Sequence, residues 1–545
     1  MRFGGKRIRI CTSIMMLLQY ILRNISGEIY CGAIFMQQLL GWNTYLSVCV
    51  ILVVVAIYTV IGGLRAVIFT DTLQTIVLVI GCVIVSILSF IEVGGWERMQ
   101  VKYMSAVKVY NYTNTSNPGC GLPREDAFHI FRDPVSGDIP WTGSTFGLTI
   151  LAMFVWCQDQ LIVQRCISAK NITHAKGGTL LAAALKFLSF PIFVLPGMIS
   201  RILYTDEVAC TDPSDCMKIC GNPAGCTNIA YPLLVLRLLP VGIRGLMLAA
   251  VLAGLMSTLT SVFNSASSIV TLDLWAQLRK QASQRELMAV GRVTVLVLVV
   301  VSVLWIPILQ QQQGGLLWFY IAAVIAYFAV PWWVAYMLGM FFKRTTEAGT
   351  FYGMVIGLLV GVIRLILDLV APPPICGSDE PDKRWTITSK VDFLHFAIIN
   401  ALLSGSIMIV ISFFTKPRTD NQLRRVTWWT RHDLKDPELT DDEDDDDDDG
   451  GVNGNDDIQI EENCEKHPDM VIKDSFTVVQ RCQNIFKDWI CGSVETEKNH
   501  VTKQERELMR RKMTSIKEGP WTSVFLNIIA VFLLTAITFL FGVFA

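Results

Sequence analysis

A hydroxyl-rich stretch inside an apolar run is the first feature that could do chemistry. Between Gly254 and Ser268, serine and threonine recur at spacings of three, four and seven residues, so several share one helical face. Hydroxyl and carbonyl oxygens are ligands for hard cations, which makes Ser257, Thr258 and the carbonyl near Gly254 candidate Na⁺ ligands. The alternative is close helix–helix packing, because hydroxyl residues also line such interfaces. The residues alone favour packing.

A second cluster combines an aromatic ring with polar groups. Trp156, Asp159 and Gln160 lie in one apolar run, and Lys186 lies in the next. A ring beside polar groups suits a sugar-like ligand, which offers both an apolar face and hydroxyls. A lysine inside a membrane is costly unless it is paired, so a polar cavity or a carboxylate is implied, with Asp159 as the nearest candidate. A structural ion pair is an equally good interpretation.

Asp71 is a third candidate, at the start of an apolar run. It could be a helix N-cap or a cation ligand, and by itself it favours the cap. Soluble-enzyme motifs such as a P-loop, HExxH or a supported GxSxG are missing, and the few histidines form no metal-like cluster. We therefore expect no enzyme activity, no organic cofactor and no metal beyond sodium.

The elements that must position these residues are membrane helices. Hydrophobic residues make up 52% of the 545 and charged residues 17%, against about 25% charged in soluble proteins, and the mean hydropathy is +0.46. Since a helix needs about 20 apolar residues to cross the bilayer, the sequence predicts an all-α polytopic membrane protein. We expect eleven spans, at 8–39, 44–62, 72–92, 144–165, 179–203, 242–271, 290–310, 316–342, 349–370, 391–414 and 522–544.

Charge and cysteine positions agree on one orientation. Basic residues gather in alternate loops, which places these loops and the N-terminus in the cytoplasm and the C-terminus outside. The outside loops 93–143, 205–240 and 371–390 hold two glycosylation acceptors, Asn111 and Asn114, and an even number of cysteines. These are Cys120, Cys210, Cys216, Cys220, Cys226 and Cys376. The four in 205–240 indicate a disulfide-stapled loop, with a zinc site as the weaker alternative. No cleavable signal peptide is evident.

Residues 415–520 form a long polar cytoplasmic insertion. Nine consecutive acidic residues at 441–449 cannot bury a core and predict a solvated, disordered linker, with a calcium or partner role as the alternative. The basic segment 503–518 suits the anionic inner leaflet.

Several long motifs resemble the sodium/glucose cotransporter family. They include the Gly-Gly-Leu segment at 62–64, the Thr-Asp-Thr-Leu-Gln-Thr segment at 70–75, and the stretches 127–134, 163–170, 196–201, 225–232 and 263–267. The resemblance spans nearly the whole chain. It implies an inverted five-plus-five helix repeat, with solute and sodium held between the repeats.

The resemblance implies a domain order. Residues 1–92 would be a three-helix remnant of the first repeat, 93–143 an extracellular glycosylated loop, and 144–342 the five-helix second repeat. Residues 343–414 would add two helices, 415–520 the acidic loop and 521–545 the last span. The resemblance further implies a plasma-membrane protein that interacts with lipid, a small solute and Na⁺, allows a single-span accessory membrane protein, and does not bind nucleic acid.

Site roles are carried over by position. The resemblance implies a sodium site at Gly254, Ser257 and Thr258, and a second sodium site at Asp71, Thr260 and Ser261. It makes Trp156 an aromatic platform for the sugar, makes Lys186 a polar pocket residue with Asp159 and Gln160 as neighbours, and pairs Cys120 with Cys376.

Two departures qualify the resemblance. Family members have three helices before the point that matches Met1, so we expect a shortened form in which neither site closes. The sugar-binding glutamine of the family is Ala322 here, and Phe319, Ile325, Val155 and Ala152 also replace polar residues. Each change removes a partner for a sugar hydroxyl and predicts weak glucose transport.

The sequence leaves three candidate functions. The first is sodium symport of a sugar such as glucose or a related polyol, or of a non-sugar organic solute. The second is a non-transporting sensor or truncated regulatory form, which the missing helices favour. The third is a membrane enzyme, for which the sequence shows no combination of nucleophile and base.

Overall fold

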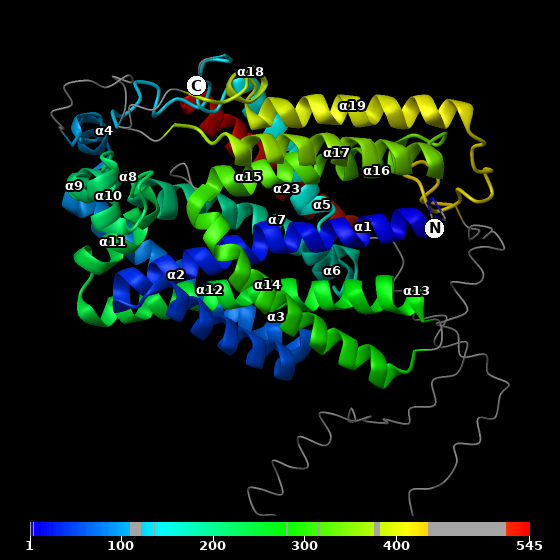
Figure 1. Cartoon of the computed structure of the whole chain (residues 1–545), viewed down its shortest axis with the longest axis horizontal. Coiled ribbons are helices and arrows are strands. Elements are labelled where there is room, and N and C mark those ends of the chain that lie inside the picture. Colours follow the sequence, from blue (N-terminus) through cyan, green and yellow to red (C-terminus); the bar gives the residue numbers. More distant parts are fainter. Residues whose placement is uncertain are drawn as a thin grey trace, which may run out of the picture.

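Several long helices run roughly along one axis (Figure 1), among them α1 (Lys6–Gln19), α12 (Val241–Ser268), α17 (Glu347–Val370) and α19 (Phe393–Phe414). A computed structural model describes residues 2–3, 5–108, 121–135, 137–279, 282–312, 317–374, 382–433 and 519–544, without the side chains of 57–70 and 306–312. The regular elements of these ranges are all helical. The first half comprises α1 (Lys6–Gln19), η1 (Tyr20–Ile25), α2 (Ser26–Leu40), α3 (Thr44–Val93), α4 (Trp96–Ser105), η2 (Gly143–Gly147), α5 (Leu148–Cys157), α6 (Gln160–Ile167), α7 (Ile172–Ser189), η3 (Phe190–Val194) and α8 (Leu195–Leu203).

Short helices and then long ones follow. They are α9 (Thr205–Val208), α10 (Pro213–Cys220), η4 (Thr227–Ile229), α11 (Ala230–Leu238), α12 (Val241–Ser268), η5 (Ile269–Trp275), α13 (Ala276–Leu278), α14 (Gln284–Gln312), α15 (Leu317–Phe328), α16 (Val330–Phe341), α17 (Glu347–Val370), α18 (Thr386–Lys390), α19 (Phe393–Phe414) and α23 (Pro520–Val543). Turns η1, η2, η3 and η5 are π-helical insertions within longer helices, a feature that is frequent at functional sites.

Seven described helices are long and apolar enough to cross a membrane, or up to ten if each of three bent pairs counts as one span. This agrees with the prediction of a polytopic helical protein. The sequence-based count of eleven is larger because it treats 8–39 and 44–62 as two spans. In the structure Lys6–Leu40 and Thr44–Ala56 form one of the bent pairs, turning by 117°. The turn uses Gly41 in the left-handed conformation (φ 69°), and Asn43 caps the next helix by accepting the Leu46 amide at 3.1 Å.

The backbone between the expected spans 44–62 and 72–92 is helical, but Asp71–Val93 by itself is long and apolar enough to cross a membrane, which agrees with the separate span predicted at 72–92. Helix α3 runs from Thr44 to Val93 as one element of 50 residues. The pair Gly62-Gly63 and the polar Asp71 suggested a loop between two spans. Glycine weakens a helix by only about 1 kcal/mol, which does not compel a break. Asp71 is therefore not the N-cap of a new helix.

Two further helices are broken where the candidate site residues lie. Helices α5 and α6 are bent by 45°, and α15 and α16 by 49°. Pro331, near the start of α16, cannot donate the backbone hydrogen bond that would continue α15. Discontinuous helices expose backbone groups within a membrane, and they typically do so around a transported ligand.

Close packing holds the second half of the bundle together. Helix α17 places a glycine at every fourth position from Gly349 to Gly361 on the side that meets its neighbours. A Cβ at Gly353 would collide with Met408 of α19, and one at Gly361 would collide with the carbonyl of Tyr327 in α15. These glycines let the backbones of neighbouring helices come into close contact, as in other membrane bundles.

The two ends of the bundle differ in composition. In Figure 1 the N-terminus lies at the end that also holds α13 and the end of α19. The C-terminus lies toward the opposite end, with α4 and with α8 to α11, which include the cysteine-rich loop. The glycosylation acceptors Asn111 and Asn114 and the acidic run 441–449 lie outside the described residues.

Candidate solute and sodium site

The break between α5 and α6 is fixed by Asp159. Its backbone is extended, and its Oδ1 accepts a hydrogen bond from the Leu161 amide at 3.1 Å, which caps α6. The side chain of Asp159 is 3% exposed, so its charge requires further partners. Tyr20 donates its hydroxyl to Oδ1 at 3.1 Å, and Arg23 donates Nη2 to Oδ2 at 3.2 Å. The carboxylate thus ties the break in α5–α6 to η1.

Lys186 does not take Asp159 as its partner, contrary to the expectation from sequence. Its Nζ lies 5.3 Å from the centroid of the Trp156 ring. A cation over the face of tryptophan is stabilised by the ring quadrupole, and the carboxylate that seemed nearest in sequence is already used by Arg23. The structure thus brings Trp156 and Lys186 together, on α5 and α7, and separates their pairing from that of Asp159.

The remaining predicted solute residues lie on two helices. Gln160 is the first residue of α6 and is half-buried. Ala322 is 4% exposed in α15 and belongs to the main hydrophobic core together with Val324 and Ile325. The position that carries a polar residue in the resembled family is therefore part of an apolar packed surface in this chain.

Candidate sodium ligands lie on α12, and three of their hydroxyls donate their protons to the helix backbone. Thr258 donates to the Gly254 carbonyl at 3.3 Å, Thr260 to the Ser257 carbonyl at 3.0 Å, and Ser261 to the same carbonyl at 2.8 Å. A hydroxyl that donates its proton to the helix backbone keeps its lone pairs for another group. These oxygens therefore fit a hard cation, which takes oxygen ligands.

Asp71 and Ser261 are joined by a cation from the chain itself. Arg165 Nη2 lies 2.7 Å from Asp71 Oδ2, and the same nitrogen donates to Ser261 Oγ. Asp71 Oδ1 is buried and has no hydrogen-bond partner within the part of the chain that the structure describes. The structure thus brings Asp71 and Ser261 together, and Thr260, the residue before Ser261 on α12, is fully buried.

The cysteine-rich loop is stapled twice. Cys210 is bonded to Cys216 and Cys220 to Cys226, which confirms the predicted disulfides. Sulfurs of Cys210, Cys216 and Cys226 lie within 4.8 Å of one another, but as disulfide sulfurs they are not available as thiolates for zinc. Cys120 and Cys376 lie outside the described residues, so their pairing stays a prediction.

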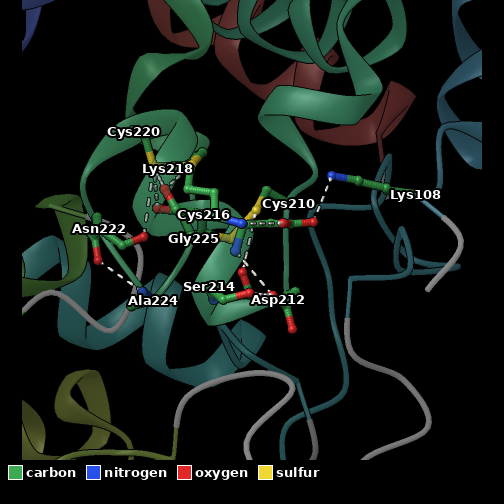
Figure 2. The surroundings of a disulfide bond; sticks show 12 residues. Lys108, Cys210, Asp212, Ser214, Cys216, Lys218, Cys220, Asn222, Ala224 and Gly225 are labelled. Carbon is green, nitrogen blue, oxygen red and sulfur yellow. Dashed lines mark hydrogen bonds and ion pairs between the residues drawn. A yellow bond between two sulfur atoms is a disulfide. The ribbon is translucent and has the colours of Figure 1, made fainter. Parts of the chain in front are cut away.

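A short helix between these disulfides has a strong cap. Asp212 Oδ2 accepts the amides of Ser214 at 3.1 Å and Asp215 at 3.0 Å (Figure 2). The hydroxyl of Ser214, followed by the amide of Asp215, holds the pKa of the Asp212 carboxyl below its usual value.

Comparison with known proteins gives the family. A model of the sodium:solute symporter family matches residues 1–357. The sodium/glucose cotransporter 4 of Danio rerio is 45% identical over 549 residues, covering 100% of this chain and 80% of the relative. The chain belongs to the sodium:solute symporter family. The sodium/myo-inositol cotransporter 2 of Homo sapiens is 44% identical over 556 residues, again covering 100% of this chain and 80% of the relative.

A solved symporter supports the fold of this family member. The substrate-bound outward-open structure of a Na⁺-coupled sialic acid symporter matches with a TM-score of 0.53 at 21% identity, over 74% of this chain and 75% of that one. At this identity the match concerns the fold alone, which is the inverted-repeat symporter fold that the motifs predicted.

Four polar residues of this symporter family member escaped sequence reasoning. Tyr20 and Arg23 pair with Asp159, and Arg165 pairs with Asp71. Gln158, at the break after α5, is 6% exposed, and both of its amide atoms lack a partner among the described residues. Each polar side chain lies inside an apolar run, which was a usable signal. The partners themselves were not recoverable, because they lie about a hundred residues apart in sequence.

Proposed function

We propose that this chain moves a sugar or a related polyol across the plasma membrane together with sodium. The pairing of Lys186 with the ring of Trp156 carries the proposal for the solute. An aromatic face with an ammonium beside it offers apolar contact to a pyranose or cyclitol ring and a hydrogen bond to one of its hydroxyls. Relatives of 44–45% identity are a sodium/glucose cotransporter and a sodium/myo-inositol cotransporter.

For the coupling ion we propose a site at the Gly254 carbonyl, Ser257 and Thr258. Oxygen ligands from one helix face are what Na⁺ requires, and the Thr258 proton points back to the helix. Binding of the ion would couple solute movement to the electrochemical gradient of sodium across the membrane. The residues of α12 hold it, and α5 and α7 hold the solute. Asp159 supports this arrangement by fixing the break in the solute helix.

The orientation we propose has the N-terminus in the cytoplasm and the C-terminus outside. The disulfide loop 205–240 requires an oxidising compartment and lies near the C-terminal end of the bundle. Helix α23 has no buried residue among those described, so its surface is open to lipid or to a single-span accessory protein.

A second candidate solute is less polar than glucose. Ala322 lies in the packed core and Phe319 packs beside it, where polar residues would hold sugar hydroxyls. A site without such partners discriminates strongly against polyhydroxy solutes such as glucose, which favours a less polar organic solute held from Trp156 and Lys186. Myo-inositol, with six hydroxyls, would have to be held by other residues.

The test is uptake of labelled glucose, myo-inositol and other polyols by the chain in proteoliposomes, with an inward Na⁺ gradient or a choline gradient. We expect sodium-dependent uptake of at least one polyol, with glucose transported weakly. Uptake that is equal in sodium and choline, or no uptake of any member of the panel by correctly inserted protein, would contradict the proposal and favour a sensor.

A further inference from the structure

Arg165 joins three helices beside the sodium ligands. It lies near the end of α6, and Nη2 contacts the Asp71 carboxylate of α3 at 2.7 Å and the Ser261 hydroxyl of α12. The arginine side chain is 38% exposed, whereas that of Asp71 is 13% exposed. The Asp71 carboxylate is therefore largely enclosed by the protein, whereas the Arg165 side chain reaches it from a more exposed position.

The surroundings of Asp71 form a cation site with one place still open. Asp71 Oδ1 is buried without a partner in the described ranges. A buried carboxylate oxygen without a hydrogen bond is unfavourable, so such an atom indicates a bound ion or water. Thr260 and Ser261 both donate their protons to the Ser257 carbonyl, so their lone pairs are available. Hydroxyl and carboxylate oxygens of this kind suit a hard monovalent cation.

We propose that Arg165 is a tethered cation that competes with sodium for Asp71 and Ser261. This proposal rests on the function proposed above. The guanidinium uses Asp71 Oδ2 and Ser261 Oγ, and a sodium ion bound to the same atoms would lie next to a second positive charge. Two cations cannot share one buried carboxylate without strong repulsion. Entry of sodium therefore requires Arg165 to leave.

Departure of Arg165 changes how α6 is attached. The arginine contact ties α6 to α3 and α12, and the neighbouring Gln164 adds one neutral bond, in which Ser265 of α12 donates to Gln164 Oε1 at 3.3 Å. When the ionic contact of Arg165 is lost, the neutral bond of Gln164 remains between α6 and α12. Sodium at Asp71 thereby loosens the C-terminal end of α6. The other end of α6 begins at the break, next to Asp159 and to Trp156 of α5. Arg165 would thus link occupancy of the ion site to the mobility of the solute helix.

The matched variants are Arg165→Gln and Gln164→Ala. Removal of the competing cation in R165Q is expected to lower the half-saturating sodium concentration for uptake by roughly fivefold or more, the lower range of site-to-site coupling. The Q164A variant loses the adjacent contact between α6 and α12 without a change of charge. We therefore expect its half-saturating sodium concentration to match that of the wild type. An unchanged or increased value in R165Q, or an equal decrease in Q164A, would overturn the proposal.

A second measurement does not depend on transport. Cys166 follows Arg165 and is a half-buried free thiol, and Cys157, at the end of α5, is an exposed free thiol that serves as an internal reference. Sodium is expected to increase alkylation of Cys166 relative to Cys157, measured by mass spectrometry, in the wild type but not in R165Q or D71N. If wild-type uptake is absent, the proposed function fails, while this labelling still decides the role of Arg165. Labelling of Cys166 that is the same in sodium and choline rejects the competition.

Discussion

The ammonium of Lys186 lies 5.3 Å from the ring centroid of Trp156, which links α7 to the last turn of α5. The contact satisfies a lysine within a membrane helix without a carboxylate. It also places a hydrogen-bond donor over the face of the aromatic ring. Both parts of the proposed sugar site therefore depend on one pair of residues from two helices.

Substitution of this pair should weaken solute binding and leave sodium binding intact. A cation–π contact is worth about 0.5–2 kcal/mol, so Lys186→Met is expected to raise the KM for the solute roughly 2- to 30-fold. Trp156→Ala should have a similar effect, and the double variant should be little worse than either single one, because the two residues act together. The measurement is KM at saturating sodium.

The matched control is Lys218→Met, which removes an exposed lysine of the stapled loop whose side chain is 78% exposed. We expect no change in KM for K218M. Additive losses in the double variant of Lys186 and Trp156 would show that the two residues contact the solute independently, contrary to our interpretation.

The ion pair between Arg23 and Asp159 should be essential for stability. The side chains are 10% and 3% exposed, and removal of one partner leaves a buried charge. Arg23→Ala is therefore expected to cost about 3–5 kcal/mol. Arg9 and Asp273 form an exposed pair at 2.9 Å, with side chains 44% and 31% exposed, and Arg9→Ala should cost less than about 1 kcal/mol. Thermal unfolding of the purified variants in detergent compares the two, and equal losses would refute the distinction.

Sequence patterns predicted the helical architecture because membrane spans are local features. Twenty apolar residues suffice to identify a span, and the hydroxyl face of α12 follows from periodicity. The roles proposed for Ser257, Thr258 and Asp71 come from the resemblance and stay predictions. Local patterns failed where the outcome depends on distant contacts. Asp71, for example, does not begin a new helix as its position suggested, because the backbone is helical from Thr44 to Val93.

Partners of charged groups were the least predictable part of the site. Asp159 was expected to neutralise Lys186, but Arg23, 136 residues earlier in the chain, reaches it instead. Arg165 and Asp71 are separated by 94 residues. Such pairs depend on how the helices pack, and no spacing rule connects them. Orphaned atoms such as the Gln158 amide likewise become visible only when burial is known.

The sodium ligands on α12 should respond separately from the solute pair. Ser257→Ala and Thr258→Val remove oxygens that would contact the ion. Since a bond to a charged group contributes about 1.5–3 kcal/mol, the half-saturating sodium concentration should rise roughly tenfold or more. Ser268→Ala on the same helix removes a hydroxyl that only donates to the Asn264 carbonyl, at 2.9 Å, and it should have no effect. If S257A, T258V and S268A changed the half-saturating sodium concentration equally, the α12 hydroxyls would serve helix packing and not ion binding.

The stapled loop should depend on pH only under strongly acidic conditions. The Ser214 hydroxyl and the Asp215 amide lower the pKa of the Asp212 carboxyl. A lowered pKa in the folded protein stabilises the fold above the ordinary aspartate value of about 3.9, and this stabilisation is lost as the pH falls through the folded value. Reduction of Cys210–Cys216 by a phosphine should therefore be equally slow at neutral and mildly acidic pH. Asp212→Ala, which removes the cap of α10, should accelerate it throughout this range.

The pH profile of D212A separates this cap from a general effect of charge on the loop. Asp206 lies in α9, close in sequence to the same disulfide, and its side chain makes no cap bond there. Asp206→Ala should leave the reduction rate of Cys210–Cys216 unchanged. The wild-type rate should approach that of D212A only below the ordinary aspartate pKa, because protonation then removes the same acceptor. If the rates converge near neutral pH, or if D206A accelerates reduction as much as D212A, the Asp212 carboxylate does not hold the loop closed.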